Sequence, residues 1–329
     1  MSRLQDVLRK LNKGKAEEDI IKKVSDQSDE YFVKDTTSTG SPLMDIMTGG
    51  GYAQGGYNTI IAEGGAGKTS CALLAIAEEQ RKTGRVGVYY DGEGTVDDSY
   101  IDRMGVDRSK LIYIKDRNLE EMLDTVEAFS TADEVGIIII DSIPIFVSSV
   151  VEQKSASDNN MAVEARKWGA RMPIIEGNAM RRNITLIGLT SYKMDPGAMG
   201  DPRKLSRGRW QYTMSNVILD LTKKGLLKDE NKKTIGHVIE YRVKKTKRRD
   251  YEPTKAFPIN FYYDYGFNKY SQMIEVFIEG GQISDLGSGM YTYSNINGEE
   301  VKVRGRQKLI NTLMENEEQY NILLNDYNG

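Results

Sequence analysis

The segment at residues 62–69 constrains the fold of this chain more than any other feature. It reads Ala-Glu-Gly-Gly-Ala-Gly-Lys-Thr and matches the Walker A phosphate-binding pattern, with alanine in the first position. An expected strand at 57–62 precedes it, and a helical pattern at 70–82 follows it. Backbone N–H groups of such a loop and the N-terminus of the following helix bind phosphate groups. The segment therefore predicts an α/β fold with a nucleotide site.

Hydrophobic strands alternate with helical stretches along the rest of the chain. Expected strands cover residues 57–62, 85–91, 111–114, 135–141, 184–190 and 217–221. Expected helices cover residues 70–82, 119–130 and 161–180. This alternation is typical of βαβ units and predicts a largely parallel sheet. The run of four isoleucines at 137–140 does not alternate with polar residues, which indicates a central strand covered on both faces.

The period changes beyond residue 233. Runs at 237–243 and 257–263 resemble a hairpin and predict an antiparallel extension of the sheet. At the other end, Leu4, Val7, Leu8 and Leu11 recur at helical spacing. We expect three regions: an N-terminal oligomerisation helix and linker at 1–33, a P-loop ATPase core at 34–273, and a small C-terminal α+β lobe at 274–329.

Composition excludes several classes of site. Cys71 is the only cysteine and His237 the only histidine, so an intramolecular disulfide, a cysteine zinc site and a histidine metal cluster are excluded. We expect Cys71 to be buried and His237 to be a hydrogen-bonded structural residue of a strand. The net charge of −3 decides nothing about nucleic acid, because clustering of cations matters more. Without a signal peptide or a long apolar run, we expect a soluble cytoplasmic protein that does not bind membranes.

The phosphate loop and two acidic residues form the predicted nucleotide site. Lys68 is expected to reach the β- and γ-phosphates, while Thr69 and Asp141 are expected to bind Mg²⁺. Asp141 could instead cap a helix. Glu93 follows a strand near the phosphate site, where it could activate water or simply be a solvated loop carboxylate. The predicted loop contacts of ATP are Glu63, Gly64, Gly65, Ala66, Gly67, Lys68, Thr69 and Ser70.

The order of these motifs resembles the RecA family of DNA recombinases. The resemblance covers roughly residues 35–325 and includes the runs Ser38-Thr39-Gly40-Ser41, Asp91-Gly92-Glu93 and Asp97-Asp98-Ser99-Tyr100. It implies that Glu93 is the catalytic base, that Tyr100 stacks on adenine and that Asp97 lies near the adenine amino group. Among relatives, the short length and divergent sequence favour a bacteriophage, UvsX-like strand-exchange protein.

The resemblance also implies a function and partners. It predicts a filament that forms on single-stranded DNA, pairs that strand with homologous duplex DNA and hydrolyses ATP with Mg²⁺ in response to DNA. A single-strand binding protein and a loader are possible further partners. Two alternatives share this core: a ring-forming DNA helicase, and a nucleotide-gated mediator that binds single-stranded DNA.

One position departs from the family. RecA proteins carry an Asn-Gln pair whose glutamine senses the γ-phosphate, and the matching residues here are Thr190 and Ser191. The serine side chain is too short to span the same distance, so Ser191 would act through water, or Tyr192 or Lys193 would replace it.

Two segments occupy the positions of the family's DNA-binding loops. The first, at 151–160, is nearly uncharged and is followed by Met161, a possible wedge between bases, and by Arg166. The second, at 192–212, is predicted as one long basic loop, in which Trp210 or Tyr212 would pack on a base or a neighbouring subunit. Plain surface loops are the alternative for both. The cations predicted to bind DNA in the second segment are Lys193, Arg203, Lys204, Arg207 and Arg209.

A basic cluster at 244–249 resembles the paired lysines that reach ATP on an adjacent RecA subunit. We assign Lys245 and Lys247 to that catalytic role. A patch for the DNA backbone and a solvated turn remain alternatives. The basic residues at 302–308 resemble the duplex-handling C-terminal lobe of RecA, or serve only solubility.

Overall fold

The computed structural model describes residues 7, 9–14, 35–149, 161–194, 197, 203–228, 231–247, 256–264 and 266–328. The chain divides into two compact units, Met1–Asp35 and Thr36–Gly329. The predicted N-terminal region at 1–33 lies mostly outside the described residues, so the fold below is that of the second unit. No helix among the described residues is both long and apolar enough to span a membrane.

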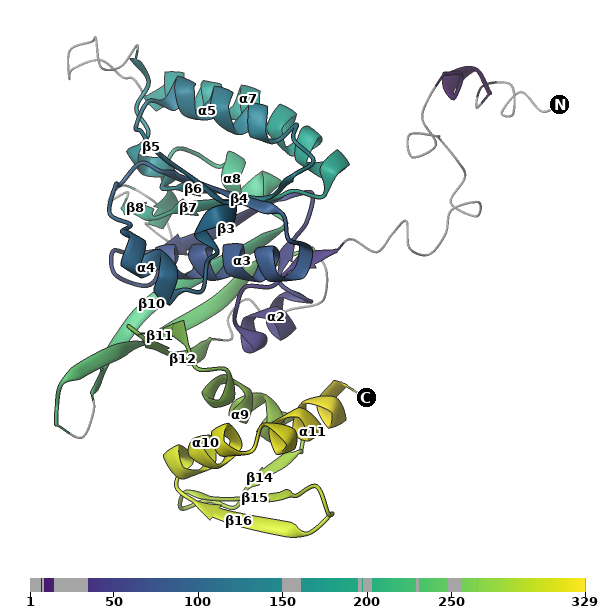
Figure 1. Ribbon diagram of the computed structural model, residues 1–329. Coiled ribbons are helices and arrows are strands. Elements are labelled where there is room, and N and C mark those ends of the chain that lie inside the picture. The colour runs from purple at the N-terminus through teal and green to yellow at the C-terminus, as the bar shows by residue number, and fades with distance from the viewer. Residues whose placement is uncertain are drawn as a thin grey trace. The chain divides into compact units, whose positions relative to one another are not determined.

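A nine-stranded sheet is the framework of the second unit (Figure 1). Its order is β13-β12-β11-β10-β3-β7-β6-β4-β5. The strands from β10 to β5 pair in parallel, and β11 to β13 are added antiparallel, which confirms the predicted class. The bounds are β3 Tyr57–Ala62, β4 Val86–Asp91, β5 Leu111–Lys115, β6 Val135–Asp141, β7 Thr185–Thr190, β10 Val217–Lys228, β11 Thr234–Thr246, β12 Phe257–Tyr262 and β13 Gly266–Phe267.

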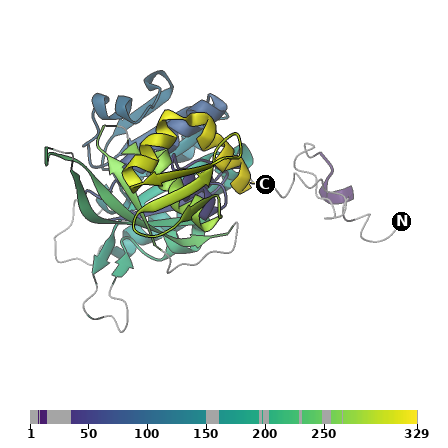
Figure 2. The ribbon, with the colours of Figure 1, turned by 90° about the horizontal axis from the view of Figure 1, so that it is seen from below.

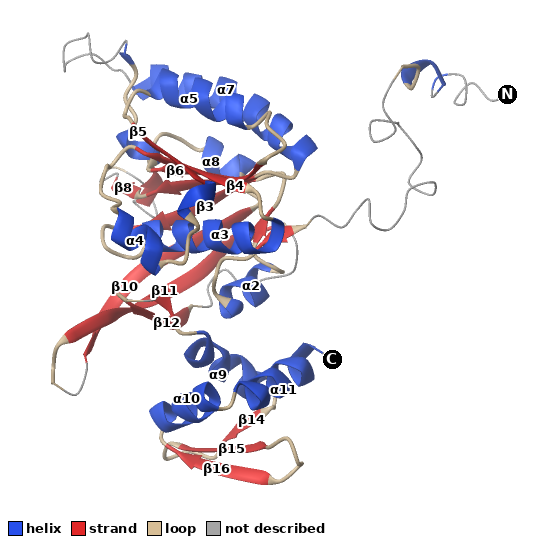
Figure 3. Ribbon diagram, viewed as in Figure 1, coloured by secondary structure: helices blue, strands red, loops and turns tan. Residues whose placement is uncertain are grey.

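Helices cover both faces of this sheet (Figure 3). One apolar core lies under α5, α7 and α8, and another joins α2, α3 and α4 to the opposite face and to the C-terminal elements. The helices and short 3-10 turns are α2 Pro42–Thr48, α3 Lys68–Thr83, α4 Asp98–Arg103, η4 Arg108–Lys110, α5 Leu119–Phe129, η5 Ile143–Ile145, α7 Met161–Arg182 and α8 Trp210–Met214.

The central strands are buried because both faces are covered. All six residues of β3 and all seven of β6 are buried, as the run of isoleucines predicts for β6. Close packing also determines where glycine must stand. A Cβ on Gly188 in β7 would lie 2.0 Å from the Tyr57 hydroxyl, so the neighbouring tyrosine leaves no room for a side chain.

The Ser-Thr-Gly-Ser run at 38–41 has a structural role. Ser41 caps α2, and its hydroxyl accepts a hydrogen bond from the Met44 N–H. The Asp45 carboxylate accepts hydrogen bonds from the Ser38 hydroxyl at 2.5 Å and from the Thr39 N–H at 2.8 Å. Burial raises the pKa of Asp45 to about 6, against the effect of these bonds. The run at 38–41 therefore fixes the conformation of the chain where α2 begins.

β10 is longer than expected. The predicted strand at 217–221 continues to Lys228 and pairs with β11 along its whole length. Its second half alternates between exposed and partly exposed residues, and beyond Leu221 it pairs with β11 but no longer with β3. This hairpin projects beyond the covering helices (Figure 1). The apolar run at 217–221 thus marks only the part of the strand that helices cover.

The segment at 192–212 is not a single long loop. It contains β8 Tyr192–Met194 paired antiparallel with β9 Arg203–Leu205, followed by α8. Hydrogen bonds between the two short strands satisfy backbone groups that a loop would leave to solvent. The glycines and prolines of this segment concealed the pairing. A second small sheet joins β1 Thr36–Thr37 to β2 Tyr52–Ala53.

The C-terminal elements form a small α+β module. Figure 2 shows them from below, in yellow, in front of the sheet. A three-stranded antiparallel sheet carries three helices, the first of which is capped by Asn268. Because this helix begins at Lys269, the expected boundary at 273 falls inside it. The bounds are α9 Lys269–Glu279, β14 Ile283–Asp285, β15 Met290–Ser294, β16 Glu300–Arg304, α10 Arg306–Glu315 and α11 Glu317–Asn328.

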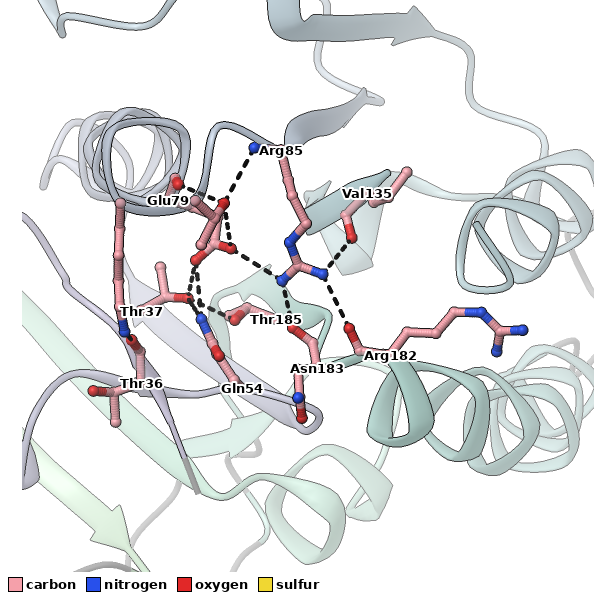
Figure 4. A network of polar contacts seen from close by, with 11 residues as sticks. Thr36, Thr37, Gln54, Glu79, Arg85, Val135, Arg182, Asn183 and Thr185 are labelled. Atoms are coloured by element: carbon pink, nitrogen blue, oxygen red, sulfur yellow. Dashed lines mark hydrogen bonds and ion pairs between the residues drawn. The ribbon is translucent and has the colours of Figure 1, made fainter. Parts of the chain in front are cut away.

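The buried carboxylate of Glu79 connects several elements of the core through hydrogen bonds (Figure 4). Glu79 of α3 is fully buried, and its oxygens accept hydrogen bonds from Thr37 at 2.7 Å, Gln54 at 3.2 Å and Arg85 at 3.1 Å. The Arg85 guanidinium also donates to the carbonyl oxygens of Val135 and of residues 182 and 183. This network joins β1, α3, β6 and the end of α7.

Replacing Glu79 with alanine should reduce the free energy of unfolding by about 3 kcal/mol, because buried donors would lose their acceptor. Urea denaturation of Glu79→Ala and of the adjacent Glu78→Ala provides the measurement and its control. Glu78 pairs with Arg81 at the surface, so its loss should cost less than about 0.5 kcal/mol. Equal destabilisation by the two variants would contradict the role given to Glu79.

Candidate active site

The carboxyl ends of the parallel strands meet around a cavity of about 680 Å³, a size suited to a nucleotide. Segments far apart in the sequence contribute its walls. The lining residues are Gly64, Gly65, Gly67, Lys68, Thr69, Ser70, Glu93, Thr95, Asp97, Tyr100, Arg103, Ser142, Pro144, Ile145, Thr190, Ser191, His237, Phe261 and Tyr263.

The phosphate loop connects β3 directly to α3. Gly67 caps α3 with a φ of 86°, a left-handed conformation that glycine adopts without strain. The first N–H groups of α3 therefore face a cavity wall made of small residues. Two of the expected contacts differ: Glu63 and Ala66 do not line the cavity. The Ala66 N–H instead donates to the Glu63 carbonyl at 3.3 Å and closes the turn.

Thr69 and Asp141 lie together, as predicted for a pair that binds a cation. The Thr69 hydroxyl donates to Asp141 Oδ2 at 3.0 Å, and the Tyr89 hydroxyl donates to the same oxygen at 2.5 Å. Asp141 Oδ1 is buried without a hydrogen-bond partner among the described residues. Burial raises the pKa of Asp141 to about 6, although both hydrogen bonds oppose the shift. A cation at this position would satisfy the buried oxygen and favour the charged carboxylate.

The oxygen donors of this pair fit Mg²⁺. Magnesium is usually held by one or two protein ligands, with phosphate oxygens and waters completing the shell. Among the residues that the structure describes, no group of three or more His, Cys, Asp or Glu side chains could hold a metal. A hydroxyl and one carboxylate beside a phosphate loop therefore match a nucleotide-bound ion better than a protein-only metal site.

Glu93 lines the cavity and accepts a hydrogen bond from a hydroxyl group beside it. The Ser142 hydroxyl donates to Glu93 Oε1 at 2.9 Å. The preceding acidic residue, Asp91, is fully buried and accepts hydrogen bonds from the Glu93 N–H at 2.8 Å and from the Tyr113 hydroxyl at 2.5 Å. The two carboxylates of the Asp-x-Glu run thus differ: Asp91 shapes the turn, and Glu93 lines the cavity.

A tyrosine and an arginine form another wall. The Tyr100 and Ser70 hydroxyls are hydrogen-bonded, and the Arg103 guanidinium lies 5.5 Å from the centre of the Tyr100 ring. Asp97 lines the cavity, but its carboxylate caps α4 and accepts hydrogen bonds from Ser99 and from the Tyr100 N–H. These bonds lower the pKa of Asp97. Its contact with the adenine amino group stays a prediction.

The facing wall comes from the antiparallel extension and was not foreseen. His237 of β11, with Phe261 and Tyr263, lines the cavity. The expected hydrogen-bonded structural histidine is wrong: His237 is 4% exposed, and neither ring nitrogen has a partner among the described residues. Only the register of β11 against β10 and β12 brings these residues to the site, and no local motif marks them. Cys71 is buried, as predicted.

Ser191 is the only one of the three sensor candidates that lines the cavity within the described part of the chain. The hydroxyl of Tyr192 donates to Asp220 at 2.9 Å, and Lys193 is exposed. The Ser191 carbonyl accepts hydrogen bonds from the N–H and hydroxyl of Ser206, just after β9. The backbone of Ser191 is therefore hydrogen-bonded to the basic segment at 192–212.

Two residues predicted to bind DNA are instead built into the core. Arg207 forms an ion pair with Glu164, which is 2% exposed, and donates to the carbonyl oxygens of Pro144 at 3.0 Å and Phe146 at 3.2 Å. Trp210 stacks on Trp168 with ring centres 5.2 Å apart. These contacts correct the expectation for both, because the Arg207 guanidinium and the Trp210 ring already have partners in α7.

The remaining predicted DNA contacts are at the surface where they are described. The Arg203 guanidinium lies 5.2 Å from the Tyr192 ring centre. Residues 151–160 and the Met161 side chain lie outside the described residues, and Tyr212 is 53% exposed. The exposed cations are Arg166, Lys193, Arg203, Lys204 and Arg209.

Lys245 and Lys247 stand away from the cavity. Tyr241 pairs with Leu221 of β10, which pairs with Ala62 at the start of the phosphate loop. Lys245 lies four residues farther along β11, about 13 Å away from the phosphate loop, toward the amino ends of the parallel strands. Its ammonium group donates to the carbonyl oxygens of Tyr212 at 2.7 Å and Thr213 at 3.2 Å. Neither lysine is therefore placed to act on a nucleotide bound in this cavity.

Removing Arg207 should destabilise the fold. Arg207→Ala leaves Glu164 charged and buried, so the free energy of unfolding should fall by about 3 kcal/mol. Arg209→Ala, which removes an exposed arginine two residues away, should change it by less than about 0.5 kcal/mol. Chemical denaturation distinguishes these outcomes, and an unchanged stability of Arg207→Ala would restore that residue as a candidate DNA ligand.

Comparison with known proteins agrees with this geometry. The family model of the RecA N-terminal domain matches residues 2–268. The protein RecA of Leptospira biflexa is 28% identical over 281 residues, covering 85% of this chain and 70% of that protein. The protein RecA of Mycoplasma mycoides is 27% identical over 300 residues, covering 91% of this chain and 84% of that protein.

A solved structure shows the same fold. The crystal structure of the RadB recombinase superposes with a TM-score of 0.53 at 17% sequence identity. The match covers 70% of this chain and 97% of that one. At this level of identity, the likeness concerns the arrangement of strands and helices alone.

Proposed function

Because the chain belongs to the RecA family, we propose that it forms a filament on single-stranded DNA and catalyses homologous pairing and strand exchange. The family binds ATP and DNA and acts in recombination and repair. One observation carries the proposal for this chain. A single cavity brings together Lys68 and Thr69 of the phosphate loop, Glu93 beside them and Tyr100 on the wall.

Each group at the cavity has a distinct chemical role in ATP hydrolysis. Lys68 and the N–H groups that open α3 bind the phosphates and stabilise charge that develops during transfer. Glu93, held by Ser142, orients a water molecule and accepts its proton. Tyr100 offers a flat ring for the adenine base, and its hydroxyl is fixed by Ser70.

Mg²⁺ would be held by Thr69 and Asp141. When bound with ATP, the ion would neutralise negative charge on the phosphates. The protein contributes the position of its two ligands, because the Tyr89 hydroxyl holds the Asp141 carboxylate in place. The unpartnered buried oxygen of Asp141 supports this assignment.

The exposed cations of the basic segment at 192–212 and of α7 support a DNA-binding surface beside this site. Lys193, Arg203 and Lys204 of the β8–β9 pair are exposed, as are Arg166 and Arg209. Exposed cations on a short hairpin can neutralise DNA phosphates and release counterions. We assign the DNA contact to these residues and exclude Arg207 and Trp210, whose side chains are committed to the core.

The placement of Lys245 and Lys247 supports a site that two subunits share. Both lie toward the opposite edge of the sheet from the cavity of their own subunit. In a helical assembly, one surface of a subunit contacts a different surface of the next subunit, so these lysines can face the cavity of a neighbour. We assign the region at 1–33 to the same assembly, as a segment that docks on a neighbouring subunit.

The low identities of 27–28% to bacterial RecA proteins support a bacteriophage-type, UvsX-like subclass. In this proposal the protein acts in the cytoplasm of a bacterial or infected cell. A single-strand binding protein and a loader would be its partners, and the C-terminal module would handle duplex DNA.

Replacing Glu93 with glutamine should slow DNA-stimulated ATP hydrolysis by about 100-fold or more, because the amide cannot accept a proton. ATP binding and ATP-dependent filaments on single-stranded DNA should persist, as seen by electron microscopy. Glu134→Gln, at an exposed position before β6, serves as a matched control with normal turnover. Unchanged hydrolysis by Glu93→Gln would remove this residue from the mechanism, and closed rings would contradict the filament.

Mixing two inactive variants tests whether the lysines act on the neighbouring subunit. Glu93→Gln lacks the base, and the double variant Lys245→Ala/Lys247→Ala lacks the lysines. If the site is shared, about one interface in four of a random mixed assembly is complete, and ATP hydrolysis should return to about a quarter of the wild-type rate. Lysines that act within their own subunit would give no recovery.

A second mixture controls for this experiment. Lys68→Ala and Glu93→Gln both damage the same side of the interface, so no arrangement of these two variants completes a site. Recovery in this control would show that subunit mixing itself raises activity, and the shared-site assignment would then fail.

A further inference from the structure

His237 is a buried polar side chain for which neither the fold nor the phosphate chemistry accounts. It is 4% exposed, and both ring nitrogens lack hydrogen-bond partners among the described residues. Burying unpaired polar atoms costs free energy, so native proteins rarely keep them without a partner. The same side chain lines the nucleotide cavity, where a bound molecule could supply that partner.

The register of β11 places His237 just beyond the phosphate loop. A Cβ on Gly67 would lie 3.0 Å from Ile239 Cδ1, so β11 abuts the loop at that residue. His237 lies two residues away on the same face of the strand, about 7 Å farther along it. This spacing puts the ring beyond the reach of the N–H groups that hold phosphates and toward the rest of a bound nucleotide.

The surroundings of the ring suit a flat, uncharged group. His237 packs against Phe261, with ring centres 5.3 Å apart, and against Tyr263, at 5.7 Å. Both aromatic residues also line the cavity. Burial, with the nearby charge of Lys223, lowers the pKa of His237. A neutral imidazole offers one N–H donor and one acceptor, a pair that a nucleobase edge or a ribose hydroxyl can match.

We propose that His237 binds the nucleoside half of ATP, by a hydrogen bond between its neutral imidazole and the base edge or a ribose hydroxyl. The proposal rests on the nucleotide site described above and adds a residue that neither the phosphate loop nor Tyr100 provides. Phe261 and Tyr263 hold the ring in place through aromatic contacts. The wall from β11 and β12 thereby contributes a polar contact to the nucleoside as well as apolar surface.

Calorimetric titration of the full chain with Mg-ADP at neutral pH tests this contact. His237→Phe keeps an aromatic ring but no hydrogen-bonding atom, and it should weaken ADP binding about tenfold. His237→Asn keeps a donor and an acceptor and should bind within about threefold of the wild type. Inorganic tripolyphosphate, which lacks a nucleoside, should bind all three proteins equally.

The ligand 2′-deoxy-ADP separates the sugar from the base. If His237 bonds the 2′-hydroxyl, the His237→Phe substitution should not weaken binding of the deoxy ligand. If it bonds the base edge or the 3′-hydroxyl, the loss should be the same for both ligands. Either result supports a nucleoside contact.

Because His237 is the only histidine, the wild-type protein permits a second test. With ¹⁵N-labelled histidine, NMR should show a shift of at least one ring nitrogen when ADP is added, whether or not a variant folds. Equal ADP affinity of wild type and His237→Phe, or ring nitrogens that do not respond to ADP, would overturn the proposal. A matching loss of tripolyphosphate binding would overturn the nucleoside assignment, and a wild type that binds no ADP would overturn the nucleotide site itself.

Discussion

The parallel pairing of β3 with β7 and β10 is the constraint on which the rest of the structure depends. All six residues of β3 are buried, so a shift of the strand by one residue would exchange the side chains that pack in the two apolar cores. Its end delivers the phosphate loop, while β7 delivers Thr190 and Ser191 to the same edge. The positions of the phosphate loop and of Thr190 and Ser191 therefore follow from one set of buried backbone hydrogen bonds.

The hairpin of β10 and β11 connects the phosphate loop with the amino ends of the parallel strands. β10 is parallel to β3 but antiparallel to β11, so the chain leaves the core beside the phosphate loop and then returns. The first residues of β11 place His237 in the cavity, and its last residues place Lys245 toward the opposite edge. One continuous strand thus contributes to the cavity of its own subunit and, in the shared-site proposal, to that of a neighbour.

Local sequence patterns were sufficient for the parts of the site that neighbouring residues determine. The strand, turn and helix around residues 62–69 and the carboxylate that ends β6 are close to where the sequence predicts them. The same patterns failed for Arg207, because its partner Glu164 is distant in the sequence and lies on another element. They failed for His237 because only strand register, set by hydrogen bonds across the sheet, brings it to the cavity.

The backbone at Ser191 is hydrogen-bonded to the segment that carries the basic β8–β9 pair. Ser206 donates two hydrogen bonds to the Ser191 carbonyl, and the adjacent Arg207 donates to the Pro144 carbonyl. Ser191 and Pro144 both line the cavity, and Ser206 directly follows β9 of the basic hairpin. The hairpin is thus attached by backbone carbonyls to two cavity walls. The contact between these cavity walls and the base of the β8–β9 hairpin therefore uses the backbone at position 191 and not its side chain.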